Sequence, residues 1–126
     1  MSHESHPFCD EIRIEQLEIS ARIGVPEEER VTPQRLTINI SFWPYQQTRD
    51  LADNIHNAIN YSVVADETKS FVRGQSVNLI ETLADQVAAH LLKTFPIQKV
   101  TVEVRKFALP DAKYVSATVT LSASIG

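Results

Sequence analysis

The stretch QRLTINISFW, residues 34–43, alternates apolar and polar side chains from Leu36 to Phe42. A period of two residues is typical of a β-strand that buries one face and keeps the other polar. Pro44 follows directly, and it is expected to end the strand because proline has no N–H to donate to the ladder. The predicted buried side chains are Leu36, Ile38, Ile40 and Phe42.

A second alternating stretch, residues 11–25, precedes this strand in the sequence. The apolar residues lie at even-numbered positions before Gln16 and at odd-numbered positions after it. This change predicts a β-bulge near Gln16, because one extra residue moves every later side chain to the other face. The two stretches together predict an antiparallel hairpin. The apolar residues are Ile12 and Ile14 before the slip and Leu17, Ile19, Ala21 and Ile23 after it.

Residues 26–33 connect the two predicted strands as a polar loop with a proline at each end. About eight residues is longer than most hairpin connections. Long surface loops often carry binding and catalytic residues, so this loop is a candidate for part of a site. It contains three consecutive glutamates, Glu27, Glu28 and Glu29.

Two amphipathic helices are predicted further along the sequence. Apolar residues recur at helical spacing over residues 63–72 and again over residues 80–94. Gly74 is expected to end the first helix, and the pair Phe95-Pro96 is expected to end the second. Each helix has a single apolar face, which indicates that each packs on one side only.

Two more alternating stretches, residues 100–104 and 115–121, complete the element order ββααββ. This order predicts an α+β fold, with a four-stranded antiparallel sheet that carries both helices on one face. The opposite face of the sheet holds Thr, Asn, Ser and Glu side chains. It could face water, or it could line a barrel closed by strands of neighbouring copies, and the pattern alone leaves both possibilities open.

Length and composition exclude several classes of protein. The chain has 126 residues and a net charge of −4, which predicts one domain over residues 11–126 after a flexible leader over residues 1–10. No apolar run approaches a membrane span and no export signal is recognisable, so a cytoplasmic protein is expected. The basic residues form no stripe, which argues against nucleic acid as a partner. The lone Cys9 has no neighbours at zinc-ligand spacing, so no metal is expected.

The head of the second helix, SVNLIE at residues 76–81, admits two interpretations. Asn78 followed three residues later by Glu81 resembles a capping box, in which both side chains bond orphan backbone donors of the first turn. Alternatively, a carboxylate at a helix start can accept two parallel N–H bonds from the planar edge of a guanidine-like ligand. The hexapeptide alone does not decide between a cap and a ligand site.

The order and spacing of several motifs over nearly the whole sequence, from about Ile12 to Leu121, resemble the dihydroneopterin aldolase family. The resemblance implies the tunnelling fold, in which four copies close their sheets into a barrel and two such rings commonly stack into an octamer. The motifs are Ile23-Gly24-Val25 with Glu29 and Gln34, Asn60-Tyr61-Ser62, Val77-Asn78-Leu79-Ile80-Glu81, and Val102-Glu103-Val104-Arg105-Lys106.

The resemblance also implies a reaction of folate biosynthesis. 7,8-Dihydroneopterin would be cleaved by a retro-aldol step into 6-hydroxymethyl-7,8-dihydropterin and glycolaldehyde. Other aldolases stabilise the resulting carbanion with a lysine Schiff base or with a metal ion. Here the C=N bond of the substrate itself can accept the electrons, so neither a cofactor nor a metal is expected. The protein would supply orientation and proton transfer.

The implied pterin-binding residue is Glu81, whose carboxylate would accept bonds from the 2-amino group and the neighbouring ring N–H. The backbone at Ile80 would help to fix the ring. A charge-assisted contact of this kind is worth roughly 2 to 4 kcal/mol of binding.

Three further residues are implied in proton handling. Lys106 resembles the catalytic lysine of the family, although an exposed lysine at a strand end would look the same in sequence. Tyr61 resembles a proton-shuttling tyrosine that enters the site of a neighbouring subunit, although it could also be a simple aromatic contact of the first helix. Glu29 resembles a loop glutamate that closes the site and holds water, with Glu28 as the fallback if the loop register slips.

Two alternative functions remain open at this point. The dihydroneopterin triphosphate 2'-epimerases share the retro-aldol half-step, and the loop at residues 23–29 and the lack of a proline directly after Lys106 resemble them. A triphosphate would need basic residues at the entrance of the site, for which Arg22, Arg30 and Arg105 are candidates. The third possibility is a non-catalytic ring-forming protein that binds a pterin-like or purine-like ligand, against which the complete set of proton-handling residues argues.

Overall fold

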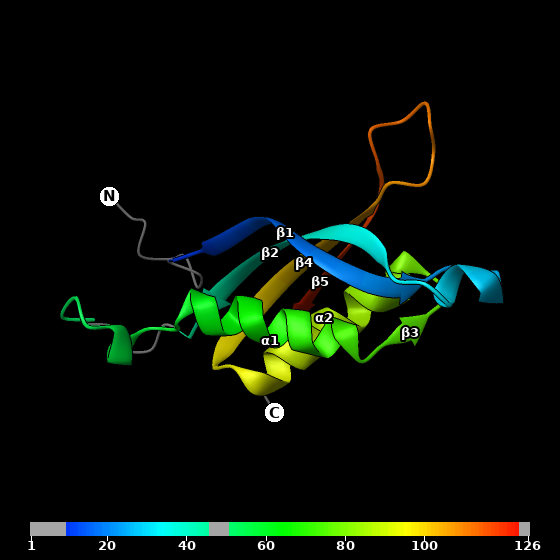
Figure 1. Cartoon of the computed structure of the whole chain (residues 1–126). Helices are drawn as coiled ribbons and strands as arrows, with labels where there is room; N and C mark the ends of the chain where they lie inside the picture. The colour runs from blue at the N-terminus through cyan, green and yellow to red at the C-terminus, as the bar shows by residue number, and fades with distance from the viewer. Residues whose placement is uncertain (1–9, 46–50, 124–126) are drawn as a thin grey trace.

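The computed structural model describes residues 10–45 and 51–123, and nearly all of the predicted leader over residues 1–10 lies outside them (Figure 1). None of the helices within these ranges is long and apolar enough to cross a membrane. Two short 3₁₀ helices, η2 (Glu27–Arg30) and η3 (Ile55–Asn57), lie in loops. The main elements are β1 (Ile12–Ile23), β2 (Gln34–Pro44), α1 (Tyr61–Arg73), β3 (Ser76–Val77), α2 (Ile80–Thr94), β4 (Ile97–Lys106) and β5 (Val115–Ser122).

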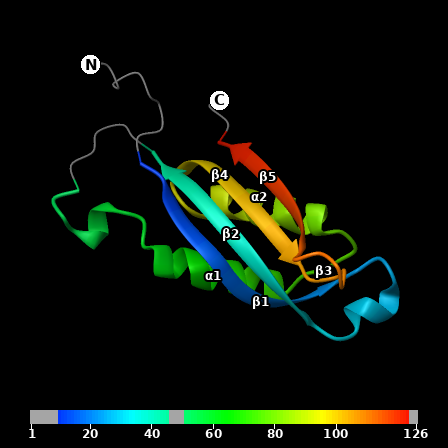
Figure 2. The same ribbon diagram turned by 90° about the horizontal axis from the view of Figure 1, so that it is seen from above.

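The strands form one sheet in the order β3-β1-β2-β4-β5, and α1 and α2 cover one of its faces (Figures 1 and 2). The four long strands pair antiparallel in this order, which confirms the predicted α+β architecture. The prediction of a purely antiparallel four-stranded sheet was incomplete, because β3 adds a fifth, parallel strand beside β1. This strand forms because the connection between the helices passes the end of β1, where the Gly24 N–H donates to the Val77 carbonyl at 3.1 Å.

The predicted β-bulge in β1 is confirmed at Gln16. Ile14 pairs with Ile40 whereas Leu17 pairs with Ile38, so the register shifts between them. Gln16 has a φ of 55°, and its N–H donates to Oδ1 of Asn39 at 2.6 Å. The extra residue returns the later apolar side chains of β1 to the face that the helices cover.

The hydrophobic core lies between the sheet and the two helices. The four apolar side chains that alternate along β2 are fully buried, as predicted: Leu36, Ile38, Ile40 and Phe42. The buried residues of α2 are Leu83, Ala84, Val87, Ala88 and Leu91, and those of α1 are Val64, Thr68 and Val72. The hydroxyl of Thr68 donates to the Val64 carbonyl at 2.8 Å, so its burial leaves the hydroxyl with a partner.

The opposite face of the sheet is polar and contains a hollow of about 350 Å³. Asn39 Nδ2 donates to Glu103 Oε1 at 2.7 Å, and Arg105 Nε lies 3.2 Å from Glu103 Oε2. Burial raises the pKa of the Glu103 carboxyl, but the combined contacts with Asn39, Arg105 and Ser116 outweigh burial and leave that pKa below its usual value. The barrel closed by strands of neighbouring copies stays a prediction.

Candidate active site at the head of α2

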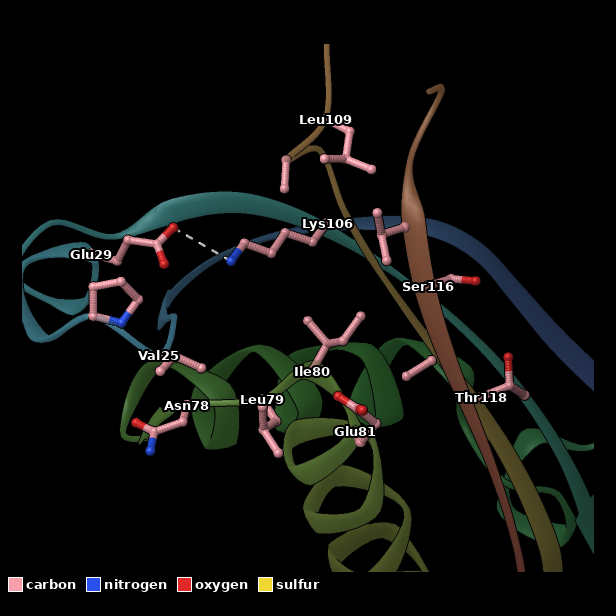
Figure 3. A pocket seen from close by; sticks show the side chains of 14 residues that line it. Val25, Glu29, Asn78, Leu79, Ile80, Glu81, Lys106, Leu109, Ser116 and Thr118 are labelled. Atoms are coloured by element: carbon pink, nitrogen blue, oxygen red, sulfur yellow. Dashed lines mark ion pairs between the residues drawn. The ribbon is translucent and has the colours of Figure 1, made fainter. Parts of the chain in front are cut away.

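A pocket of about 620 Å³ opens where the loop after β1, the head of α2 and the adjoining ends of β4 and β5 meet (Figure 3). Segments far apart in the sequence thus converge at one end of the sheet. Four of the five predicted site residues line it. The lining residues are Val25, Pro26, Glu29, Asn78, Leu79, Ile80, Glu81, Lys106, Ala108, Leu109, Val115, Ser116, Ala117 and Thr118.

Lys106 and Glu29 form an ion pair on one wall of the pocket. Lys106 is the last residue of β4 and lies between Leu36 of β2 and Val115 of β5 in the sheet. Its Nζ is 3.5 Å from Oε2 of Glu29, and only 16% of its side chain is exposed, against 41% for Glu29. An ammonium next to a carboxylate in a part-enclosed pocket can hold and transfer protons, which is what acid–base chemistry requires.

The backbone at Gly24 determines where the Glu29 side chain lies. Gly24 has a φ of +143°, which side-chain-bearing residues rarely adopt. A Cβ at this position would also lie 2.6 Å from Cβ of Glu29, so the glutamate occupies the space that a side chain would fill. Glu28, the fallback in the sequence-based prediction, does not line the pocket. Of these two glutamates, Glu29 is the one that lines the pocket.

Glu81 and Ile80 lie at the start of α2 on the wall opposite Lys106 (Figure 3). The predicted capping role of Asn78 is wrong. The N-cap residue is Leu79, which has extended dihedral angles of −118° and 142°, and no side chain within the described residues caps the first turn. Because the helix begins one residue later than a capping box requires, Glu81 is its second residue and the box cannot form. The carboxylate is thus available to a ligand.

Tyr61 is the one predicted site residue that does not line this pocket. It is the first residue of α1, and 61% of it is exposed. A location on the surface of its own subunit fits a tyrosine that serves the site of a neighbouring copy, as the family resemblance implies. That role remains a prediction.

The three arginines considered as triphosphate ligands do not line the pocket either. Arg22 Nη1 donates to the carbonyl of Arg30 at 3.2 Å, and Arg30 Nη1 donates to the carbonyl of Gly24 at 2.7 Å. Arg105 is paired with a glutamate and lies over the ring of Tyr114, with 4.2 Å between its Cζ and the ring centroid. Among the described residues, the only cationic side chain in the pocket lining is Lys106.

Several apolar lining residues were not predicted from the sequence. Val25, Leu79 and Leu109 are 64%, 45% and 53% exposed, although large apolar side chains are usually buried. They lie in loops or at a helix cap, where no periodicity marks them. Their exposure around one pocket gives it apolar walls, which suit a flat ring held by a few polar groups.

Comparison with known proteins gives consistent results. The family model described as dihydroneopterin aldolase matches residues 12–121. A probable dihydroneopterin aldolase 3 of Arabidopsis thaliana is 32% identical over 96 residues, which are 76% of this chain but only 59% of that relative. The dihydroneopterin aldolase of Streptomyces coelicolor is 31% identical over 103 residues, covering 82% of this chain and 84% of the relative. The structure of Escherichia coli dihydroneopterin aldolase in complex with neopterin superposes with a TM-score of 0.81 at 27% identity, covering 90% of this chain and 100% of that one.

Proposed function

Since this protein belongs to the dihydroneopterin aldolase family, we propose that it cleaves 7,8-dihydroneopterin by a retro-aldol reaction into 6-hydroxymethyl-7,8-dihydropterin and glycolaldehyde. One observation within the molecule carries the proposal. The Lys106–Glu29 ion pair, with 3.5 Å between Nζ and Oε2, shares a pocket of about 620 Å³ with the carboxylate of Glu81. A proton-handling pair and a carboxylate for ligand recognition are thus combined in one cavity of suitable size.

We assign ring recognition to the head of α2. In this proposal Glu81 accepts hydrogen bonds from the 2-amino group and the adjacent ring N–H of the pterin, and Ile80 supports the ring. The support is the exposed position of Glu81 in the first turn, where no cap uses it, beside the apolar Leu79. A carboxylate suits this task because two parallel N–H bonds fix both the position and the orientation of a planar ligand.

The chemical step needs heterolytic cleavage of a carbon–carbon bond in the substituent of the pterin ring. A base removes the proton of the hydroxyl group on this substituent, the departing fragment leaves as glycolaldehyde, and the bonding electrons enter the neighbouring C=N bond of the ring. A proton then returns to the ring-side carbon to give the hydroxymethyl product. Lys106 lies at a strand end opposite Glu81 and is assigned to the ring nitrogen, and Glu29 is assigned to the water and hydroxyl groups of the substituent.

Tyr61 is assigned to the site of a neighbouring subunit, so we propose a ring-shaped homo-oligomer with sites between subunits. The assignment rests on the family resemblance and on the position of Tyr61 outside its own pocket. Mixing inactive Tyr61→Phe and Lys106→Ala subunits tests it, because random assembly would restore about a quarter of the sites. A mixture without any regained activity would contradict a shared site. The tetrameric or octameric state and the cytoplasmic location remain predictions.

The choice of an unphosphorylated substrate over the triphosphate rests on the arginines. Arg22 and Arg30 bond loop carbonyls, and Arg105 pairs with Glu103, so none of the three considered for phosphate binding is on the pocket wall. A triphosphate carries several negative charges that basic groups would have to balance. The aldolase reaction is therefore our first choice, and the 2'-epimerase is the alternative.

The decisive assay supplies purified protein with 7,8-dihydroneopterin and, in a separate reaction, with its triphosphate. Release of glycolaldehyde from the first substrate is the expected result. Formation of the 2'-epimer from the triphosphate, without glycolaldehyde from the first substrate, would instead establish the epimerase. No product from either substrate would overturn the enzymatic proposal and leave a pterin-binding protein.

A further inference from the structure

Arg30 connects the end of the short 3₁₀ helix η2 to the two residues that follow β1. It is the last residue of η2, and its Nη1 donates to the carbonyls of Gly24 at 2.7 Å and Val25 at 3.0 Å. The guanidinium therefore folds back onto the residues where the loop leaves β1. One nitrogen atom satisfies two carbonyls, which a flexible loop would otherwise leave to water.

Further contacts fix the same loop on either side. The Gly24 N–H donates to the Val77 carbonyl at 3.1 Å, and the side-chain amide of Gln34 donates to the Ile23 carbonyl at 2.6 Å. Arg22 Nη1 donates to the carbonyl of Arg30 at 3.2 Å. These contacts hold the two ends of the loop, and the segment between them, residues 26–29, includes Glu29.

Arg30 ends this segment, and Glu29 directly precedes Arg30 in the sequence. The Glu29 N–H donates to the Pro26 carbonyl at 3.0 Å, and its side chain packs on Gly24, whose carbonyl Arg30 holds. If Arg30 were lost, the carboxylate of Glu29, whose side chain is 41% exposed, could move into solvent and away from Lys106. A displacement of about 1 Å is enough to lower a catalytic rate substantially.

We propose that Arg30 is a positioning residue of the active site: by bonding the carbonyls of Gly24 and Val25, it holds the carboxylate of Glu29 next to Lys106. The inference rests on the proposed aldolase reaction. Arg30 touches no reacting atom in this assignment and acts only through Glu29. Because a single nitrogen makes both bonds, the ammonium of a lysine can replace it, whereas an apolar side chain of similar length cannot.

A double-mutant cycle between Arg30 and Glu29 tests the proposal. Arg30→Met is expected to lower kcat by about tenfold to a hundredfold with KM changed less than about threefold, and Arg30→Lys is expected to recover most of the loss. In a Glu29→Ala background, Arg30→Met should cost less than about twofold, because the residue it positions is already absent. Arg73→Met, at the end of α1 and outside the pocket lining, is the matched control and should keep full activity.

Two kinetic results would overturn the proposal: no loss of kcat in Arg30→Met, or a loss of equal size with and without Glu29. Amide hydrogen exchange over residues 24–31 gives a second readout that does not depend on turnover. Exchange should be faster in Arg30→Met and normal in Arg30→Lys, and unchanged exchange in Arg30→Met would also overturn the proposal. A wild-type protein that releases no glycolaldehyde would refute the proposed function instead, and the exchange data would still decide whether Arg30 holds the loop.

Discussion

The two helices begin in different ways. At the start of α1, the side chain of Asn60 accepts a hydrogen bond from the Ser62 N–H at 2.9 Å, as in an ordinary N-cap. At the start of α2, Leu79 occupies the cap position, and in the part of the chain that the structure describes no side chain caps the first turn. The capped start lies away from the pocket, whereas the uncapped start forms one of its walls.

This difference separates residues that stabilise a helix from residues that are free to bind a ligand. α2 buries five side chains and α1 only three, so packing compensates α2 for the missing cap. A cap is worth about 1 kcal/mol, which is less than burying one large apolar side chain. The polar and charged groups at the head of α2 can therefore face the pocket without the helix losing its place in the fold.

The largest effect is expected across the pocket from the head of α2. Lys106→Ala should abolish release of glycolaldehyde while pterin binding stays within about tenfold of the wild type, because the lysine is assigned to the reaction and not to the ring edge. Release of glycolaldehyde measures turnover, and pterin fluorescence measures binding. Full activity of this variant would show that the assigned mechanism is wrong.

The next effect concerns binding at the head of α2 itself. Glu81→Ala should weaken pterin binding by about 2 to 4 kcal/mol, or about 30-fold to 1,000-fold in Kd, because a two-point charged contact is lost. The exposed Asp85, one turn later on the same helix, is the matched control, and Asp85→Ala should leave Kd unchanged. Equal effects of the two variants would mean that only the general charge of the helix matters.

A smaller effect, on stability, is expected at the start of α1. Asn60→Ala should lower the free energy of unfolding by about 1 kcal/mol because the Ser62 N–H loses its partner. Asn60→Asp should retain most of this stabilisation, because its carboxylate can accept the same bond. Urea unfolding at fixed protein concentration measures the change. An unchanged midpoint in Asn60→Ala would remove the contrast between the two helix starts.

The smallest effect sharpens the same contrast from the other side. Asn78→Ala should change the free energy of unfolding by less than about 0.5 kcal/mol, because Asn78 does not cap α2. The same urea experiment serves, with Asn60→Ala as the positive control. A loss as large as that of Asn60→Ala would restore the capping-box interpretation.

The long strands and both helices could be predicted because their signals are local. Alternation in β2 marks a strand by itself, and the parity slip at Gln16 marks the bulge without knowledge of the partner strand. β3 could not be predicted, because two residues have no period and their pairing depends on where the backbone passes in space. The apolar spacing gave the observed bounds of α2, whereas the capping-box interpretation of Asn78 would have started the helix one residue too early, since packing of the helix against the sheet decides its start as much as the capping residues do.

The candidate site was predictable only in part. Glu29, Glu81 and Lys106 could be named because a resemblance over the whole sequence gave them an order, whereas each alone would pass for a surface charge. The hydrogen bonds of Arg30 and the apolar residues of the pocket wall are not marked by any motif or periodicity in the sequence. They depend on loop conformation, and loop conformation follows from many weak contacts.

The bulge at Gln16 also limits which insertions and deletions the protein tolerates. Deleting Gln16 would leave one residue on each strand between the pairs Ile14–Ile40 and Leu17–Ile38, so the ladder would become regular and the later side chains of β1 would keep their faces. A one-residue deletion between Leu17 and Ile23 would instead either turn part of β1 to the other face or move Gly24, and Glu29 with it, along the sheet. Length is therefore constrained in β1 between Leu17 and Gly24, whereas one residue can be lost at the bulge without a shift of the pocket.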